Sequence, residues 1–162
     1  MCSQELGLRT LPPRAGDSMP ASDVISGVAR QGKADVGFVR SFSDEDKTEL
    51  LRLAAAVVYT PQREHFGIVP IEAMAAHRPV IACASGGPLE SIKHGETGFL
   101  QAPEAAAFAE SMCAVARDPA AALAMGAAGR KRAVDTFSRA AFGERLSDVC
   151  EHLVRHGNLK GL

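Results

Sequence analysis

Short, largely apolar segments alternate with helical segments along most of this chain, and that alternation limits its fold more than any other feature. Runs at 36–39, 57–60, 79–83 and 97–100 predict four strands. They are continuously apolar rather than alternating, which is typical of strands covered on both faces. Because parallel strands need helical crossovers between them, the pattern predicts an α/β fold with a partial Rossmann-like sheet.

The helical segments carry their own start and stop signals. Ser43 opens a sequence resembling a capping box, which predicts a helix through about Ala55. Pro70 falls in the first turn of a predicted helix over 67–77, where a missing N–H costs little. Further helices are predicted at 23–33, 88–93, 104–117, 119–136 and 138–156.

The length of 162 residues suits one domain with a sizeable core. Residues 1–22 contain several prolines and few apolar side chains, which indicates a flexible or foreign leader. The main domain is predicted over 23–157, and residues 158–162 form a short tail. No apolar run approaches the roughly 20 residues of a membrane-spanning helix, so we expect no transmembrane segment in this sequence.

Composition argues against two kinds of partner. The net charge is −1, and the few aromatic residues do not interleave with basic ones, so no nucleic-acid partner is expected. Cys150, His152 and His156 stand at helical spacings that would suit a metal. They lack a fourth ligand, and we interpret them as a solvated helix end, with no metal site predicted.

Two glutamates, Glu64 and Glu72, flank a loop that opens into a helix. Gly67 allows the backbone to approach a ligand closely. Phe66, Gly67 and Ile68 can present unpaired N–H groups at the helix N-terminus, which is a suitable place for a phosphate group. On spacing alone, Glu64 could equally be a solvated charge in a loop and Glu72 a residue on the surface of a helix.

A second loop follows the next predicted strand. Because the carboxyl ends of parallel strands meet at one edge, we expect the loops 60–66 and 84–87 to converge there. The candidate ligand-binding residues of the second loop are Ser85, Gly86 and Gly87. A strand-to-helix turn that needs small residues explains them nearly as well. His65 is a candidate ligand contact, or a loop residue filling space beside Phe66.

These motifs occur in order with Gly86-Gly87-Pro88-Leu89-Glu90 and Thr97-Gly98-Phe99-Leu100. Together they resemble the E-x7-E region of retaining GT-B glycosyltransferases of the group 1 (family 4) type. Within that family, the chain looks most like the mannosyltransferases that act on dolichol-linked oligosaccharides. The resemblance covers residues 36–155 and is strongest over 57–100. It implies that the α/β fold is a partial, Rossmann-like C-terminal domain of a GT-B enzyme.

The resemblance also implies roles for individual residues. Glu64 is similar to the catalytic glutamate that contacts the donor sugar near its reacting carbon, and Glu72 to the one that binds the nucleotide ribose. The implied donor-binding residues are His65, Phe66, Gly67, Ile68, Glu72, Ser85, Gly86 and Gly87. The implied donor is a nucleotide sugar, GDP-mannose, and the implied acceptor is a lipid-linked oligosaccharide. The scheme needs no metal and no other cofactor.

GT-B enzymes have two Rossmann-like domains. This sequence has no match to the family's acceptor-binding domain. It also has no match to the basic pair that clamps the diphosphate in the family. The resemblance therefore implies a C-terminal fragment, whose full-length enzyme acts at the cytosolic face of the endoplasmic reticulum membrane. The alternative is a catalytically silent module that binds nucleotide sugars or another protein.

Overall fold

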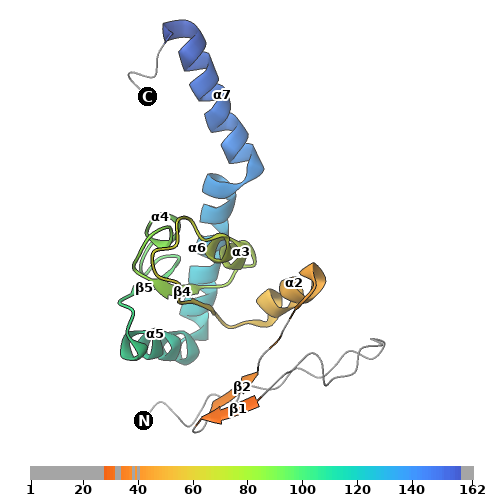
Figure 1. Cartoon of the computed structure of the whole chain (residues 1–162), viewed down its shortest axis with the longest axis vertical. Coiled ribbons are helices and arrows are strands. Elements are labelled where there is room, and N and C mark those ends of the chain that lie inside the picture. The colour runs from red at the N-terminus through yellow and green to blue at the C-terminus, as the bar shows by residue number, and fades with distance from the viewer. Residues whose placement is uncertain (1–27, 32–33, 38, 40, 158–162) are drawn as a thin grey trace. The chain divides into compact units, whose positions relative to one another are not determined.

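The structure is a computed structural model that describes residues 28–31, 34–37, 39 and 41–157 (Figure 1). It divides into two compact units, Met1–Leu50 and Leu51–Leu162. The predicted leader over 1–22 and the tail over 158–162 lie outside the described residues.

The first unit contains an antiparallel strand pair, β1 (Val28–Gln31) and β2 (Ala34–Gly37). The predicted helix over 23–33 is therefore wrong for 28–31, and its other residues lie outside the described part. Only two residues separate the strands, a hairpin length, and an isolated helix this short is marginal in water. The strand predicted at 36–39 overlaps β2, but β2 pairs with β1 and not with the parallel sheet.

The next helix, α2 (Asp44–Leu53), begins as the capping box predicts. The Ser43 hydroxyl accepts a 3.1 Å hydrogen bond from the Asp46 N–H. The Asp46 carboxylate in turn accepts one of 3.2 Å from the Ser43 N–H. This reciprocal pair satisfies two backbone donors at the helix start.

The second unit is built on a parallel sheet of three strands in the order β3-β4-β5. These are β3 (Val57–Tyr59), β4 (Val80–Cys83) and β5 (Gly98–Gln101). All four residues of the central strand β4 are buried. The strands predicted at 57–60, 79–83 and 97–100 are confirmed, as is their parallel pairing.

In the part of the chain that the structure describes, five helices follow or connect these strands: α3 (Ile68–Ala75), α4 (Pro88–Ser91), α5 (Ala105–Arg117), α6 (Pro119–Phe137) and α7 (Arg139–His156). The Asp118 and Ser138 side chains cap α6 and α7, accepting from Ala121 N at 2.9 Å and Ala141 N at 3.1 Å. Gly157 ends α7 in the left-handed conformation, with φ 69°. Among the described residues, no helix is both long enough and apolar enough to cross a membrane.

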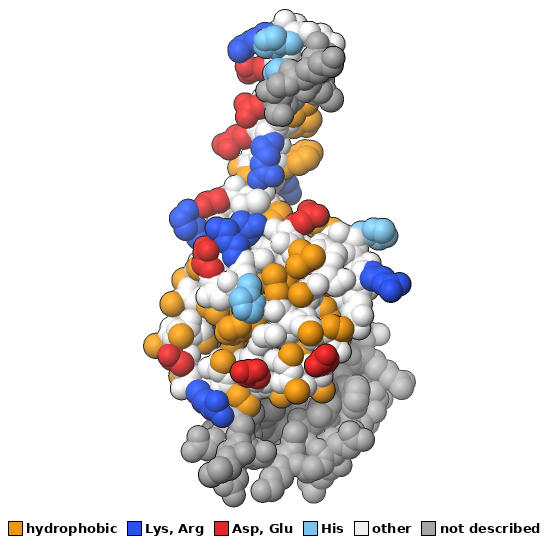
Figure 2. All heavy atoms as spheres, turned by 90° about the vertical axis from the view of Figure 1, so that its left-hand side faces the viewer, with side chains coloured by type: hydrophobic (Ala, Val, Ile, Leu, Met, Phe, Trp, Pro, Cys, Tyr) orange, Lys and Arg blue, Asp and Glu red, His pale blue; other side chains and the backbone are white. Residues whose placement is uncertain are grey.

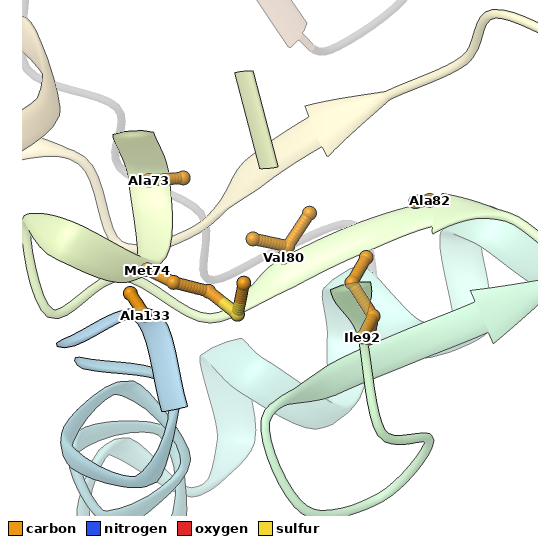
Figure 3. Close-up of a cluster of buried hydrophobic side chains, with 6 residues drawn as sticks. All are labelled: Ala73, Met74, Val80, Ala82, Ile92 and Ala133. Atoms are coloured by element: carbon orange, nitrogen blue, oxygen red, sulfur yellow. The ribbon is translucent and has the colours of Figure 1, made fainter. Parts of the chain in front are cut away.

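The core lies between the sheet and the helices α3 and α6. Its buried side chains are Ala73, Met74, Val80, Ala82, Ile92 and Ala133 (Figure 3). Burying one side chain such as Met74 contributes about 1.5–3 kcal/mol. Gly126 of α6 lies so close to α3's C-terminal turn that a Cβ there would be 2.2 Å from the carbonyl oxygen of His77. This close packing fixes α3, and therefore the position of its N-terminus.

Candidate functional site

The two predicted ligand loops meet at the carboxyl end of the parallel sheet. The first joins β3 to α3, and the second joins β4 to α4. The Gly87 N–H donates to the Glu64 carbonyl oxygen at 2.9 Å, and the Arg63 N–H donates to the Ser85 hydroxyl at 3.2 Å. The expectation that the loops converge is therefore confirmed.

The glycines of the second loop are required by this contact. A Cβ on Gly86 would lie 2.1 Å from the Glu64 carbonyl oxygen, and one on Gly87 would lie 2.0 Å from that of Phe66. Gly86 also has a φ of +61°, which side chains rarely adopt. The second loop, through Ser85, Gly86 and Gly87, thus supports the first loop directly. A substitution at these positions would therefore affect ligand binding at least partly by moving the first loop.

The first loop ends at the N-terminus of α3. Gly67 is the N-cap, with φ 74° and no side-chain capping hydrogen bond, and the first turn has no acidic residue. The first N–H groups of a helix have no intrahelical partner, and the helix dipole adds partial positive charge there. Gly67 itself is buried, and a Cβ on it would meet Tyr59 Oη at 3.1 Å and Glu64 Cγ at 3.3 Å.

The Glu64 side chain lies beside this helix end and is partly buried. Its Oε1 accepts a 3.1 Å hydrogen bond from the His65 N–H. The Tyr59 hydroxyl approaches the Glu64 side chain from the other side of Gly67, where a Cβ would lie 3.1 Å from Tyr59 Oη and 3.3 Å from Glu64 Cγ, and it interacts with the Glu64 carboxylate. Burial of the Tyr59 hydroxyl raises its pKa above 10.0, and the charge and hydrogen bond of Glu64 raise it further. The carboxylate is thus held from two directions next to an uncapped helix N-terminus.

The other predicted site residues occupy different surroundings. Glu72 lies in the second turn of α3 and is partly buried, while His65 is exposed. Ile68 is 62% exposed and Phe66 is 42% exposed, so apolar surface borders the helix end. The Phe66 ring still makes an edge contact with Phe137, with centroids 5.9 Å apart.

Side-chain contacts connect this apolar surface at the start of α3 to α6. The Arg132 guanidinium lies over the Phe137 ring, 5.7 Å from its centroid. Arg132 also donates to the carbonyl oxygens of Glu90 at 2.6 Å and Ser91 at 2.8 Å, at the end of α4. One arginine therefore connects the aromatic contact of the first loop with the helix that follows the second loop.

Among the residues that the structure describes, no three His, Cys, Asp or Glu side chains gather to hold a metal ion. His152 and His156 stack with centroids 4.4 Å apart on α7. Arg155 forms a 3.0 Å ion pair with Glu151 on the same helix. Figure 2 shows acidic, basic and histidine side chains side by side along this part of α7, which fits a solvated helix end.

The contact between Tyr59 and Glu64 is not predicted from the sequence, which indicates Tyr59 only as a strand residue. The available signal was its position, because Tyr59 ends β3 at the carboxyl edge where ligands bind such sheets. It is also the one tyrosine of a chain without tryptophan. The role of Arg132 had no comparable signal, since it depends on how α6 packs.

Residues 28–132 match the protein family described as "Glycosyl transferases group 1". The chain is 52% identical over 111 residues to the human "Alpha-1,3/1,6-mannosyltransferase ALG2", covering 68% of this chain and 27% of that protein. It is 48% identical over 119 residues to the Mus musculus protein of that name, covering 74% of this chain and 29% of the relative. The chain thus spans less than a third of the length of these curated relatives.

A solved structure shares the arrangement of these elements. The crystal structure of Anabaena Alr3699/HepE in complex with UDP matches with a TM-score of 0.61 and 26% sequence identity. The match covers 65% of this chain and 29% of that one.

Proposed function

Because this chain belongs to the group 1 glycosyltransferase family, we propose that its second unit is the donor-binding part of a retaining mannosyltransferase. The mixed α/β fold with a parallel sheet is the predicted partial GT-B domain, and its match to the UDP-bound protein supports that assignment. One observation carries the proposal further. The carboxylate of Glu64 lies beside the N-terminus of α3, which has no side-chain capping hydrogen bond.

The N-terminus of α3 is the proposed site for the donor diphosphate. Its free N–H groups and the helix dipole favour negative charge, and its first turn contains no acidic residue, although the Glu64 carboxylate lies beside it. During transfer the bond between the sugar and the diphosphate breaks while the acceptor hydroxyl oxygen bonds to the same sugar carbon from the same face. Negative charge grows on the leaving diphosphate oxygens, which take up the proton of that hydroxyl. Donors placed at such a developing charge are worth about 2.7–4 kcal/mol each. This scheme neutralises the leaving group without a metal ion or other cofactor.

Glu64 is the proposed catalytic residue at the sugar, and Glu72 the proposed partner of the nucleotide ribose. Glu64 belongs to the loop before α3 and Glu72 to the second turn of α3, so in this proposal the two carboxylates contact different parts of one donor. A donor diphosphate between them would leave the sugar near Glu64. His65, Phe66 and Ile68 then border the donor from the first loop and the start of α3.

The relatives are named mannosyltransferases, which supports a mannosyl donor. We assign GDP-mannose as that donor and a lipid-linked oligosaccharide as the acceptor. The corresponding location is the cytosolic face of the endoplasmic reticulum membrane. These assignments rest on the family relationship and concern the whole enzyme of which this chain corresponds to one part.

Calorimetric titration of the purified chain with GDP-mannose tests the proposal. We expect binding that Glu64→Gln weakens by about tenfold, the loss of one charged hydrogen-bond partner. Glu110→Gln on α5 is the matched control, because Glu110 is an exposed glutamate on a helix without a role in the site. Equal affinity of the two variants, or no binding by the unmodified chain, would contradict the proposed function.

A further inference from the structure

Tyr59 belongs to the parallel sheet, whereas the Glu64 side chain that it approaches belongs to a loop. It is the last residue of β3 and pairs with Ala82 of the central strand. Its ring packs against the hydrophobic core. Its hydroxyl reaches past Gly67 to the Glu64 carboxylate. A rigid strand end therefore places a hydrogen-bond donor on a loop side chain.

We propose that Tyr59 is a positioning residue whose hydroxyl holds the Glu64 carboxylate beside Gly67, oriented toward the sugar of a bound donor. This role rests on the proposed function, in which Glu64 faces that sugar. Tyr59 itself does not contact the donor in this proposal and acts through the Glu64 carboxylate.

The geometry explains why a second donor is needed. The His65 N–H binds Oε1 of Glu64 at 3.1 Å, but this contact lies within adjacent residues of one loop. A single bond leaves the carboxylate free to rotate about its remaining side-chain torsions. The Tyr59 hydroxyl adds a contact from a different element and fixes the orientation. Functional side chains are held best when supporting groups on rigid elements lock their rotamers.

Gly67 is part of the same arrangement. The position that its Cβ would occupy lies 3.1 Å from Tyr59 Oη and 3.3 Å from Glu64 Cγ. Tyrosine and glutamate thus approach each other across the space that a side chain would take. A Cβ at Gly67 would make these two side chains shift by a few tenths of an ångström, in addition to the strain of the positive φ of 74°.

The single tyrosine allows a direct spectroscopic test. Because the chain has one Tyr and no Trp, its absorbance change on tyrosine ionisation reports Tyr59 alone. We expect the Tyr59 pKa to lie above 10.0 in the unmodified chain and in Glu110→Gln, and to be lower in Glu64→Gln. Burial remains in that variant, so the shift shrinks without vanishing. Far-ultraviolet circular dichroism checks that each variant is folded. An unchanged Tyr59 pKa in folded Glu64→Gln would overturn the proposal.

A ligand comparison separates positioning from general distortion. Tyr59→Phe keeps the ring and removes the hydroxyl, so GDP-mannose affinity should fall about tenfold, the effect of one hydrogen bond to a charged group. Affinity for GDP, which lacks the sugar, should stay within about twofold of the unmodified value. Equal losses for both ligands, or no loss for either, would overturn the sugar-orienting role.

The two experiments distinguish this proposal from the proposed function. If the unmodified chain binds neither ligand, the proposed function is contradicted and the sugar-orienting role falls with it. The titration then still decides whether Tyr59 holds Glu64. If GDP-mannose binds and the titration fails, the proposed function stands and the positioning role is overturned.

Discussion

The Gly87 N–H donates a 2.9 Å hydrogen bond to the carbonyl oxygen of Glu64, so the turn after β4 fixes the loop that follows β3. The backbone of Glu64, whose carboxylate lies at the N-terminus of α3, is thereby held by a neighbouring loop. Its side chain is held separately by Tyr59 and the His65 N–H. Backbone and side chain of Glu64 are thus positioned by different elements.

Gly87→Ala should destabilise the fold, because its Cβ would lie 2.0 Å from the Phe66 carbonyl oxygen. Overpacking of this kind costs about 1–3 kcal/mol. Urea unfolding followed by circular dichroism measures the change. Gly143→Ala is the control, since Gly143 lies within α7 and its Cβ would meet nothing within 4 Å. That control should be neutral or stabilised by up to about 1 kcal/mol from helix propensity. Equal stability of the two variants would contradict the loop packing.

Arg132→Met should lower the free energy of unfolding by about 1.5–3 kcal/mol, since two carbonyl oxygens at the end of α4 lose a charged donor. Methionine keeps much of the apolar stem, so the change isolates the guanidinium. Lys131→Met, at the neighbouring and exposed position, removes only a surface ion pair with Asp135 and should cost less. Chemical denaturation of both proteins provides the comparison. A larger loss for Lys131→Met would refute the anchoring role of Arg132.

Tyr59 should make stability depend on pH in the alkaline range. Its pKa in the folded chain is raised above 10.0, chiefly by burial and then by Glu64, whereas an unfolded tyrosine ionises near about 10. Below that pH both states keep the proton. As pH rises through the folded pKa, the unfolded state releases the proton more readily, and the free energy of unfolding falls. Tyr59→Phe should lack this component, which denaturation on both sides of pH 10 would reveal. Identical pH profiles would contradict the raised pKa.

The sequence predicted the second unit well because its signals are local. The apolar runs at 57–60 and 79–83 correspond to β3 and β4. The helices predicted at 119–136 and 138–156 correspond to α6 and α7, which Asp118 and Ser138 cap. The convergence of the two ligand loops also followed from sequence, since parallel strands bring their carboxyl ends to one edge.

The remaining features depend on packing that no local pattern encodes. The antiparallel pairing of β1 with β2 replaced a predicted helix because strand pairing depends on the partner as well as on propensity. Sequence leaves Gly86 and Gly87 as either ligand contacts or a turn that needs small residues, and their close approach to the Glu64–Phe66 backbone emerges only in three dimensions. The contact between Tyr59 and Glu64 likewise crosses from strand to loop.

The most direct measurement is a titration of the isotopically labelled chain with GDP-mannose, followed by amide chemical shifts. The account predicts that the backbone N–H signals of Gly67, Ile68 and Val69 change most and saturate together, because these groups surround the proposed diphosphate site at the start of α3. Gly67→Ala should weaken this binding, whereas Gly95→Ala should leave it unchanged. The second glycine has a similar φ of +77°, but its Cβ would meet nothing within 4 Å. Shifts confined to other elements, such as α7, or equal effects of the two substitutions would contradict a donor site at the N-terminus of α3.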